Sequence, residues 1–145
     1  MDKVQTRKLH KEDAPEISRI YAAITRKAVN SDFKRVVEEH ALRDDEACFV
    51  AEHEGKIVGF MISYILTGGF GMTKSAWIAT LGVDPDFMGT GIGAGLAEEI
   101  FNYYKTQGIE NVYTSVRWDS TDLLSFFKTL GFDRSNFINL RKIID

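Results

Sequence analysis

The chain has little of several features that would assign it to a specialised class of protein. Its single cysteine, Cys48, excludes an internal disulfide and is typical of a reducing compartment. No stretch approaches the roughly 18 apolar residues of a membrane-spanning helix, and the first residues carry no apolar signal core. We therefore expect a cytoplasmic protein that does not associate with membranes.

The charge balance excludes another class. The 18 Lys and Arg residues stand against 21 Asp and Glu residues, which gives a net charge of −3. Proteins that bind nucleic acid are usually strongly basic on their binding face, so we expect no nucleic-acid partner. Hydrophobic residues make up 44% and charged residues 27% of the 145-residue chain. Such a composition and length predict one globular domain, residues 1–145.

Hydrophobic periodicity and turn residues predict an α/β fold with a mixed sheet, in the order β-α-α-β-β-β-α-β-α-β. Early strands joined by hairpins predict antiparallel pairing, and the later strand-helix-strand alternation predicts a parallel pair. Strands are expected at residues 4–9, 47–51, 56–66, 75–83 and 112–116, with one or two closing strands in 132–143. Helices are expected over 14–28, after a cap at Asp13; over 33–40; from Ile92 to a stop at Gly108; and from a cap at Asp119 or Ser120 to a stop at Gly131.

The most informative segment runs from Leu81 to Leu96, where a predicted strand passes through glycines into a helix. Glycines let backbone approach a ligand closely, and the N–H groups and dipole of a helix N-terminus favour anions. Two interpretations are open here: a pyrophosphate cradle, or a tight turn that merely needs glycine. Two known phosphate motifs do not fit. The dinucleotide fingerprint lacks its acidic strand end, and a P-loop-like stretch at residues 68–75 leads into a strand instead of a helix.

Residues 88–93 (MGTGIG) resemble the acyl-CoA-binding turn of the GNAT superfamily of N-acetyltransferases. Residues 120–132 (STDLLSFFKTLGF) resemble the second signature of that family, and the hairpin at 49–60 matches in its place. The resemblance covers nearly the whole chain in the right element order. It implies a GNAT-like acyl-CoA N-acyltransferase fold.

The resemblance also implies a binding site for acetyl-CoA or CoA, and no metal. The backbone of Leu81 and Val83 would pair with the pantetheine arm, and a nearby N–H would polarise the thioester carbonyl. The amides of residues 89–94 would hold the pyrophosphate. The full set of implied CoA-binding residues is Leu81, Gly82, Val83, Met88, Gly89, Thr90, Gly91, Ile92, Gly93, Ala94, Ser120, Phe126 and Phe127.

The sequence departs from the family at the positions that carry its acid–base chemistry. Phe127 replaces the Tyr that often serves as general acid, and Trp77 and Ser115 occupy the two usual carboxylate positions. Met88 replaces the common Gln or Arg, and Ser120 the common Asn. No catalytic residue is assigned, and Thr80 and Ser115 are candidates for a water relay.

The function that the resemblance implies is CoA-dependent N-acetyl transfer. A primary amine of a small molecule, or a lysine or N-terminus of a protein, would attack the thioester directly. Relatives are often dimers, so the resemblance admits a homodimer, although the sequence itself does not identify the oligomeric state. Two other hypotheses remain open: a non-catalytic acyl-CoA-binding or sensory module, and a nucleotide-binding protein unrelated to CoA.

Several other residues carry weaker signals. His10, His40 and His53 are scattered without ligand spacing, so no metal site is expected, and Cys48 is interpreted as a small core residue. The acidic run at residues 38–46 is either a solvated face or an attractor for a cationic amine. The Gly68–Gly71 loop is a candidate lid. The aromatic residues Tyr64, Phe70, Trp77 and Trp118 could line an acceptor pocket or fill a core.

Overall fold

The computed structural model describes residues 4–26, 31–67 and 73–145 of the chain. The Gly68–Gly71 loop, the candidate lid, therefore lies outside the described residues. The chain divides into two compact units, residues 1–115 and residues 116–145. That both belong to one domain stays a prediction. No helix in the described part of the chain is long and apolar enough to cross a bilayer.

The first unit is built on a five-stranded sheet with the strand order β1-β2-β3-β4-β5. The first four strands pair antiparallel with their neighbours, and the last pair, β4 with β5, is parallel. The mixed sheet predicted from the sequence is therefore confirmed. The strands are β1 (Gln5–Lys8), β2 (Cys48–His53), β3 (Lys56–Leu66), β4 (Ser75–Val83) and β5 (Val112–Thr114).

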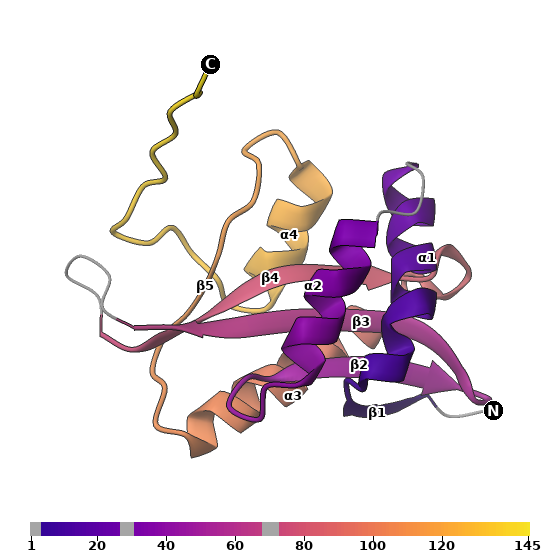
Figure 1. Ribbon diagram of the computed structural model, residues 1–145. Helices are drawn as coiled ribbons and strands as arrows, with labels where there is room; N and C mark the ends of the chain where they lie inside the picture. Colours follow the sequence, from indigo (N-terminus) through magenta and orange to yellow (C-terminus); the bar gives the residue numbers. More distant parts are fainter. Residues whose placement is uncertain (1–3, 27–30, 68–72) are drawn as a thin grey trace. The chain divides into compact units, whose positions relative to one another are not determined.

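Helices cover both faces of this sheet. Figure 1 shows α1 (Ala14–Thr25) and α2 (Ser31–Ala41) on one face and α3 (Ile92–Thr106) on the other. Two short 3-10 helices, η1 (Lys11–Asp13) and η2 (Pro85–Phe87), precede α1 and follow β4. The core under α1 and α2 contains Cys48, which is 2% exposed and so occupies the predicted core position. Its largest fully buried members are Phe60, Leu9, Ile17 and Ile62.

Asp13 was expected to cap α1 with its side chain, and it does not. Its carboxylate instead accepts hydrogen bonds from the Arg7 guanidinium at 2.8 Å and from the His10 backbone N–H at 2.8 Å. Glu16, the expected second member of the capping box, accepts a bond from the Ile57 N–H at 3.1 Å. Asp13 thus ties the entry of α1 to β1, and Glu16 ties α1 to β3, because donors outside the helix take both carboxylates in place of the local cap.

The second unit contains one helix, α4 (Thr121–Thr129), which ends before Gly131 in a left-handed conformation (φ +93°). The prediction of a closing strand within 132–143 is wrong, since residues 132–145 form neither helix nor strand. A strand needs a neighbouring strand for its hydrogen bonds, and no other strand is present among residues 116–145. Apolar side chains in the segment 132–145 are correspondingly exposed, among them Ile138 at 83% and Leu140 at 88%.

A buried hydroxyl pair holds the beginning of β2 from the α3 face. The Tyr104 hydroxyl, on a side chain that is 1% exposed, accepts the N–H of Ala47 at 3.0 Å and lies 2.7 Å from the Ser63 hydroxyl. Ser63 in turn donates to the Ala47 carbonyl. Burial raises the pKa of Tyr104, so its hydroxyl keeps its proton. Every polar atom of this group thus has a partner.

Replacing Tyr104 with Phe removes one hydroxyl and leaves the buried Ala47 N–H without an acceptor. We expect Tyr104→Phe to lower the free energy of unfolding by about 1–3 kcal/mol, the usual cost of an unsatisfied buried group. Urea titration followed by circular dichroism measures it. Tyr103→Phe is the matched control, because the Tyr103 hydroxyl makes an exposed bond to the Asp44 carbonyl. Equal losses in the two variants would contradict the buried role.

Candidate functional site

Strand β4 changes its pairing halfway along its length. Up to Ile78 it is bonded on both sides, to β3 and to β5. At that point the register with β3 shifts between Ile62 and Ser63, which leaves Ala79 as an extra residue in β4. The Thr114 hydroxyl at the end of β5 donates to the Ile78 carbonyl at 3.0 Å. The two parallel strands therefore separate at a bulge.

Beyond the bulge, one edge of β4 has no neighbouring strand in the described part of the chain. The Asp84 N–H donates to the Val58 carbonyl at 2.8 Å, so this residue faces β3. Backbone groups alternate in direction along a strand, which places those of Gly82 toward β3 as well. The N–H and C=O groups of Leu81 and Val83 therefore point to the side from which β5 has departed.

The strand then passes through η2 into a turn of two left-handed glycines, Gly89 (φ +79°) and Gly91 (φ +86°). A Cβ at either position would meet nothing within 4 Å, so the turn backbone is open. Gly91 is the N-cap residue of α3, and the first amides of a helix have no acceptor within the helix. Open amides at the positive end of a helix dipole form an arrangement that binds anions.

Two glycines inside the strands bring helices close to the end of β4. A Cβ on Gly59, which pairs with Val83, would lie 2.8 Å from the Ile92 side chain. A Cβ on Gly82 would lie 2.9 Å from Ile24 of α1. The first turn of α3 and the last turn of α1 thus flank this part of the sheet on opposite faces. Sequence reasoning did not use Gly59, although a glycine within a strand is a known signal of close approach.

The positions expected to hold acid–base groups carry none in the first unit. Trp77 stacks on Tyr113 with ring centroids 5.0 Å apart, and pairs across the ladder with Tyr64. Ser115 is exposed and directly follows β5. Thr80 is half-buried and shares the α1 side of the sheet with Gly82, two residues on. Hydroxyl groups are therefore the side-chain polar groups that β4 and β5 offer beside the bulge.

Three predicted CoA-binding residues lie in the second unit. Ser120 occupies the N-cap position of α4 but makes no side-chain cap bond. Phe126 and Phe127 lie on α4, and Phe127 makes edge contacts with Phe126 at 5.2 Å and Phe132 at 5.1 Å. Their role toward a ligand of the first unit stays a prediction.

The acidic run at residues 38–46 is not one solvated face. Asp44 and Asp45 are exposed, but Glu46 is 5% exposed and its Oε1 lies 2.7 Å from His40 Nδ1. Buried Glu46 therefore fits neither alternative for the acidic run, a solvated face or a surface attractor for a cationic amine. Of the four aromatic residues proposed for an acceptor pocket, Tyr64 and Trp77 are brought together. Trp118 is 86% exposed in the second unit, and Phe70 lies outside the described residues.

Comparison with known proteins finds N-acetyltransferases among the relatives of this chain. The chain is 29% identical over 103 residues to mycothiol acetyltransferase of Amycolatopsis mediterranei, covering 69% of this chain and 34% of that protein. It is 33% identical over 99 residues to an uncharacterized N-acetyltransferase of Methanocaldococcus jannaschii, covering 66% and 43%. The matches thus span a third to under half the length of these relatives.

A solved structure shows the same fold over the whole chain. The aminoglycoside N-acetyltransferase AAC(6′)-Iy, crystallised in complex with CoA, superposes with a TM-score of 0.83 at 16% identity, covering 99% of this chain and 96% of that one. A similarity at this identity shows the fold alone. The model of the acetyltransferase (GNAT) family matches residues 14–132, which include the open edge of β4, the glycine turn and α4. The chain therefore belongs to the acetyltransferase (GNAT) family.

Proposed function

We propose that the chain is a cytoplasmic, CoA-dependent N-acetyltransferase that joins an acetyl group to a primary amine. The observation that carries the proposal is the continuity of the open edge of β4 with the glycine turn and the N-terminus of α3. One ligand could contact all three only if it had an amide-bearing arm at one end and a diphosphate at the other. CoA has both.

The residues present fit such a ligand. The outward backbone groups of Leu81 and Val83 are spaced to pair with the amides of the pantetheine arm, as an added strand would. The amides from Gly89 to Ala94 would hold the pyrophosphate without help from a side chain, which compensates for Met88 at the position where relatives carry Gln or Arg. Phe126 and Phe127 would pack near the thiol end.

The chemistry follows from this placement. The acceptor nitrogen attacks the thioester carbonyl carbon, the C–N bond forms, the C–S bond breaks, and the thiolate leaves with a proton from solvent. A thiol has a pKa of about 8.5, so its anion leaves without help from a strong acid. Phe127 in place of the usual Tyr general acid therefore lowers the rate of transfer only a little. A backbone N–H on the open edge of β4 would stabilise the oxyanion. The main contributions of the protein are then positioning and this N–H.

Removal of the proton from the acceptor amine is the harder step. With Trp77 and Ser115 at the carboxylate positions, Thr80 and Ser115 could only pass the proton to water. At pH 7 a lysine-type amine, with a pKa of about 10.4, is neutral in about 0.04% of molecules, whereas an α-amine near 7.7–8.0 is neutral in about one molecule in ten. We therefore propose that acceptors of low amine pKa are preferred.

The glycine turn gives the first test. We expect Gly91→Ala to weaken the binding of CoA at least about tenfold in calorimetric titration. A Cβ at a left-handed position distorts the turn and removes a charge-assisted hydrogen bond to the diphosphate. Gly95→Ala is the matched control: it lies inside α3, its Cβ would meet nothing within 4 Å, and its CoA affinity should not change.

Pantetheine, which lacks the diphosphate, distinguishes the contribution of the glycine turn to binding from that of β4. Its affinity should be the same in the wild type and in Gly91→Ala. If Gly91→Ala bound CoA as the wild type does, the turn would not be the diphosphate site. If the wild type bound no CoA, the proposed function itself would be wrong.

The acceptor preference gives the second test. At pH 7 we expect thiol release from acetyl-CoA to be at least about tenfold faster with an α-amine peptide than with an Nα-blocked lysine peptide. The rate with the lysine peptide should rise about tenfold per pH unit between pH 7 and 9, since the neutral amine is the nucleophile. Equal rates for the two peptides at neutral pH would contradict the preference.

A second candidate function rests on the same departures. Phe127, Trp77 and Ser115 would also mark lost chemistry in a protein that binds acyl-CoA without turning it over. Binding of acetyl-CoA with no thiol release over a panel of small amines, peptides and aminoglycosides would favour this sensory role.

A further inference from the structure

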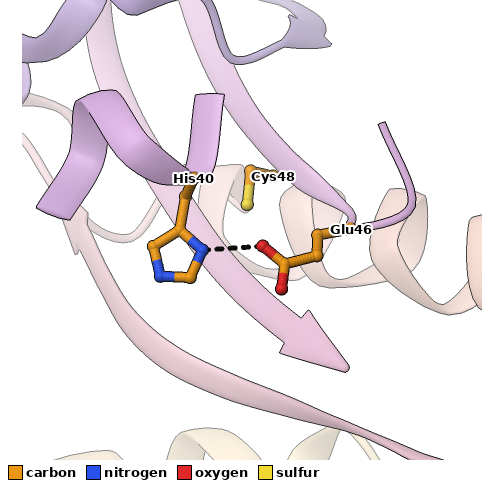
Figure 2. Close-up of side chains that lie close together, drawn as sticks. All are labelled: His40, Glu46 and Cys48. Atoms are coloured by element: carbon orange, nitrogen blue, oxygen red, sulfur yellow. Dashed lines mark hydrogen bonds and ion pairs between the residues drawn. The ribbon is translucent and has the colours of Figure 1, made fainter. Parts of the chain in front are cut away.

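A second group of polar side chains lies away from β4, at the beginning of β2. His40 is near the end of α2, Glu46 precedes β2, and Cys48 is its first residue. The turn between α2 and β2 folds back, and as a result one donor atom from each side chain lies within 4.8 Å of the others. Figure 2 shows the His40 ring and the Glu46 carboxylate in contact, with the Cys48 sulfur directed toward them.

The three groups are largely withdrawn from solvent. The side chains of Glu46 and His40 are 4% and 19% exposed, and Cys48 is 2% exposed. Glu46 Oε1 lies 2.7 Å from His40 Nδ1, and its Oε2 accepts the Ile65 N–H at 3.4 Å. A carboxylate in such a place requires compensation by positive charge or by strong donors.

The neighbouring basic side chain provides little of that compensation. The Arg43 guanidinium approaches Glu46 only to 4.0 Å, on a side chain that is 63% exposed, where screening by water weakens the attraction. The Cys48 thiol donates only a weak bond, to the Ser63 carbonyl at 3.3 Å. A divalent cation among the three groups would pair with both the carboxylate and the thiolate, so the cluster has the charge to accept one.

The donor set indicates which cation. A thiolate, an imidazole and a carboxylate together favour zinc over magnesium or calcium, which prefer oxygen ligands. In a tetrahedral zinc site the ligand atoms are about 3.4 Å apart, given bond lengths of about 2.0–2.3 Å. Donors already within 4.8 Å of one another need only small side-chain movements to reach that spacing. Three protein ligands leave a fourth position for water.

We propose that His40 Nδ1, Glu46 Oε1 and Cys48 Sγ form a zinc-binding site that fastens the end of α2 to the beginning of β2. When the cation binds, the thiol proton passes to solvent and the contact between Glu46 and His40 is replaced by two bonds to the metal. This departs from the expectation of no metal, which rested on the family resemblance and on the spacing of the histidines.

The site is separate from the proposed transfer chemistry. Cys48 pairs across the ladder with Ile62, which pairs with Thr80. Neighbouring strands are about 4.8 Å apart, so two strand spacings, about 10 Å, separate Cys48 from the bulge. The metal therefore lies outside the proposed transfer chemistry, and CoA binding does not depend on the proposal.

Cobalt provides a sharp test, because Cys48 is the only cysteine of the chain. Chelator-treated full-length protein is titrated with Co²⁺ and observed by absorption. We expect the thiolate-to-cobalt charge-transfer band and the visible bands of four-coordinate cobalt, both abolished by Zn²⁺. Such a band can come only from Cys48. Its absence in the wild-type protein would overturn the proposal whatever the variants do.

The variants assign the other two ligands. Glu46→Gln, which is nearly isosteric, and His40→Gln should each lower the affinity for Zn²⁺ at least about tenfold, measured by competition with Co²⁺. Cys48→Ser should abolish the charge-transfer band. The control His10→Gln, at an exposed histidine, should bind as the wild type does. A band with wild-type affinity in either glutamine variant would overturn the assignment of that ligand and hence the three-residue site. Calorimetry with CoA on the metal-free protein tests the proposed function independently.

Discussion

The proposed function of this chain depends on one constraint: the backbone N–H and C=O groups of a strand must find hydrogen-bond partners. Strand β4 satisfies it on both sides as far as Ile78 and on one side beyond the bulge at Ala79. A strand edge without a neighbour is a template for a ligand that has amide groups of its own. In the part of the chain that the structure describes, the open edge is therefore a local loss of pairing, and the proposed function rests on it.

The elements around that edge are held by close packing rather than by polar contacts. Glycine at positions 59 and 82 lets the side chains of Ile92 and Ile24 approach the strands more closely than any Cβ would permit. The N-terminus of α3 therefore lies where β4 ends, and the dipole of the helix acts on the same region as the free amides of the turn. In the proposed function, affinity for the diphosphate would arise from the backbone and would not require a side chain at Met88.

The beginning of β2 is the other point at which polar groups concentrate. On the α3 face, the hydroxyls of Tyr104 and Ser63 satisfy both backbone groups of Ala47. On the α2 face, Glu46 and His40 meet beside Cys48, whose pKa burial raises to about 12. The thiol therefore stays protonated at neutral pH unless a cation replaces the proton. Polar groups on both faces fix a strand start that the apolar core alone would leave less specific.

The sequence alone determined the element order of the first unit, the mixed pairing of its sheet and the glycine turn. Hydrophobic periods and turn residues are local signals, and they predicted the bounds of β3 and β4 as the structure has them. Local signals also misled. Asp13 has the sequence of a helix cap but pairs with Arg7, and the apolar residues of 132–143 have the composition of a strand but no strand partner in their unit.

Only the tertiary structure decided where β4 parts from β5, because a bulge depends on the register of two strands and leaves no mark in either one. It alone also brought together His40, Glu46 and Cys48. Their spacing in the sequence matches no ligand pattern, and Glu46 reads there as one more acid in a charged run. Burial of that acid results from the direction in which the α2–β2 turn folds back, and long-range packing sets this direction.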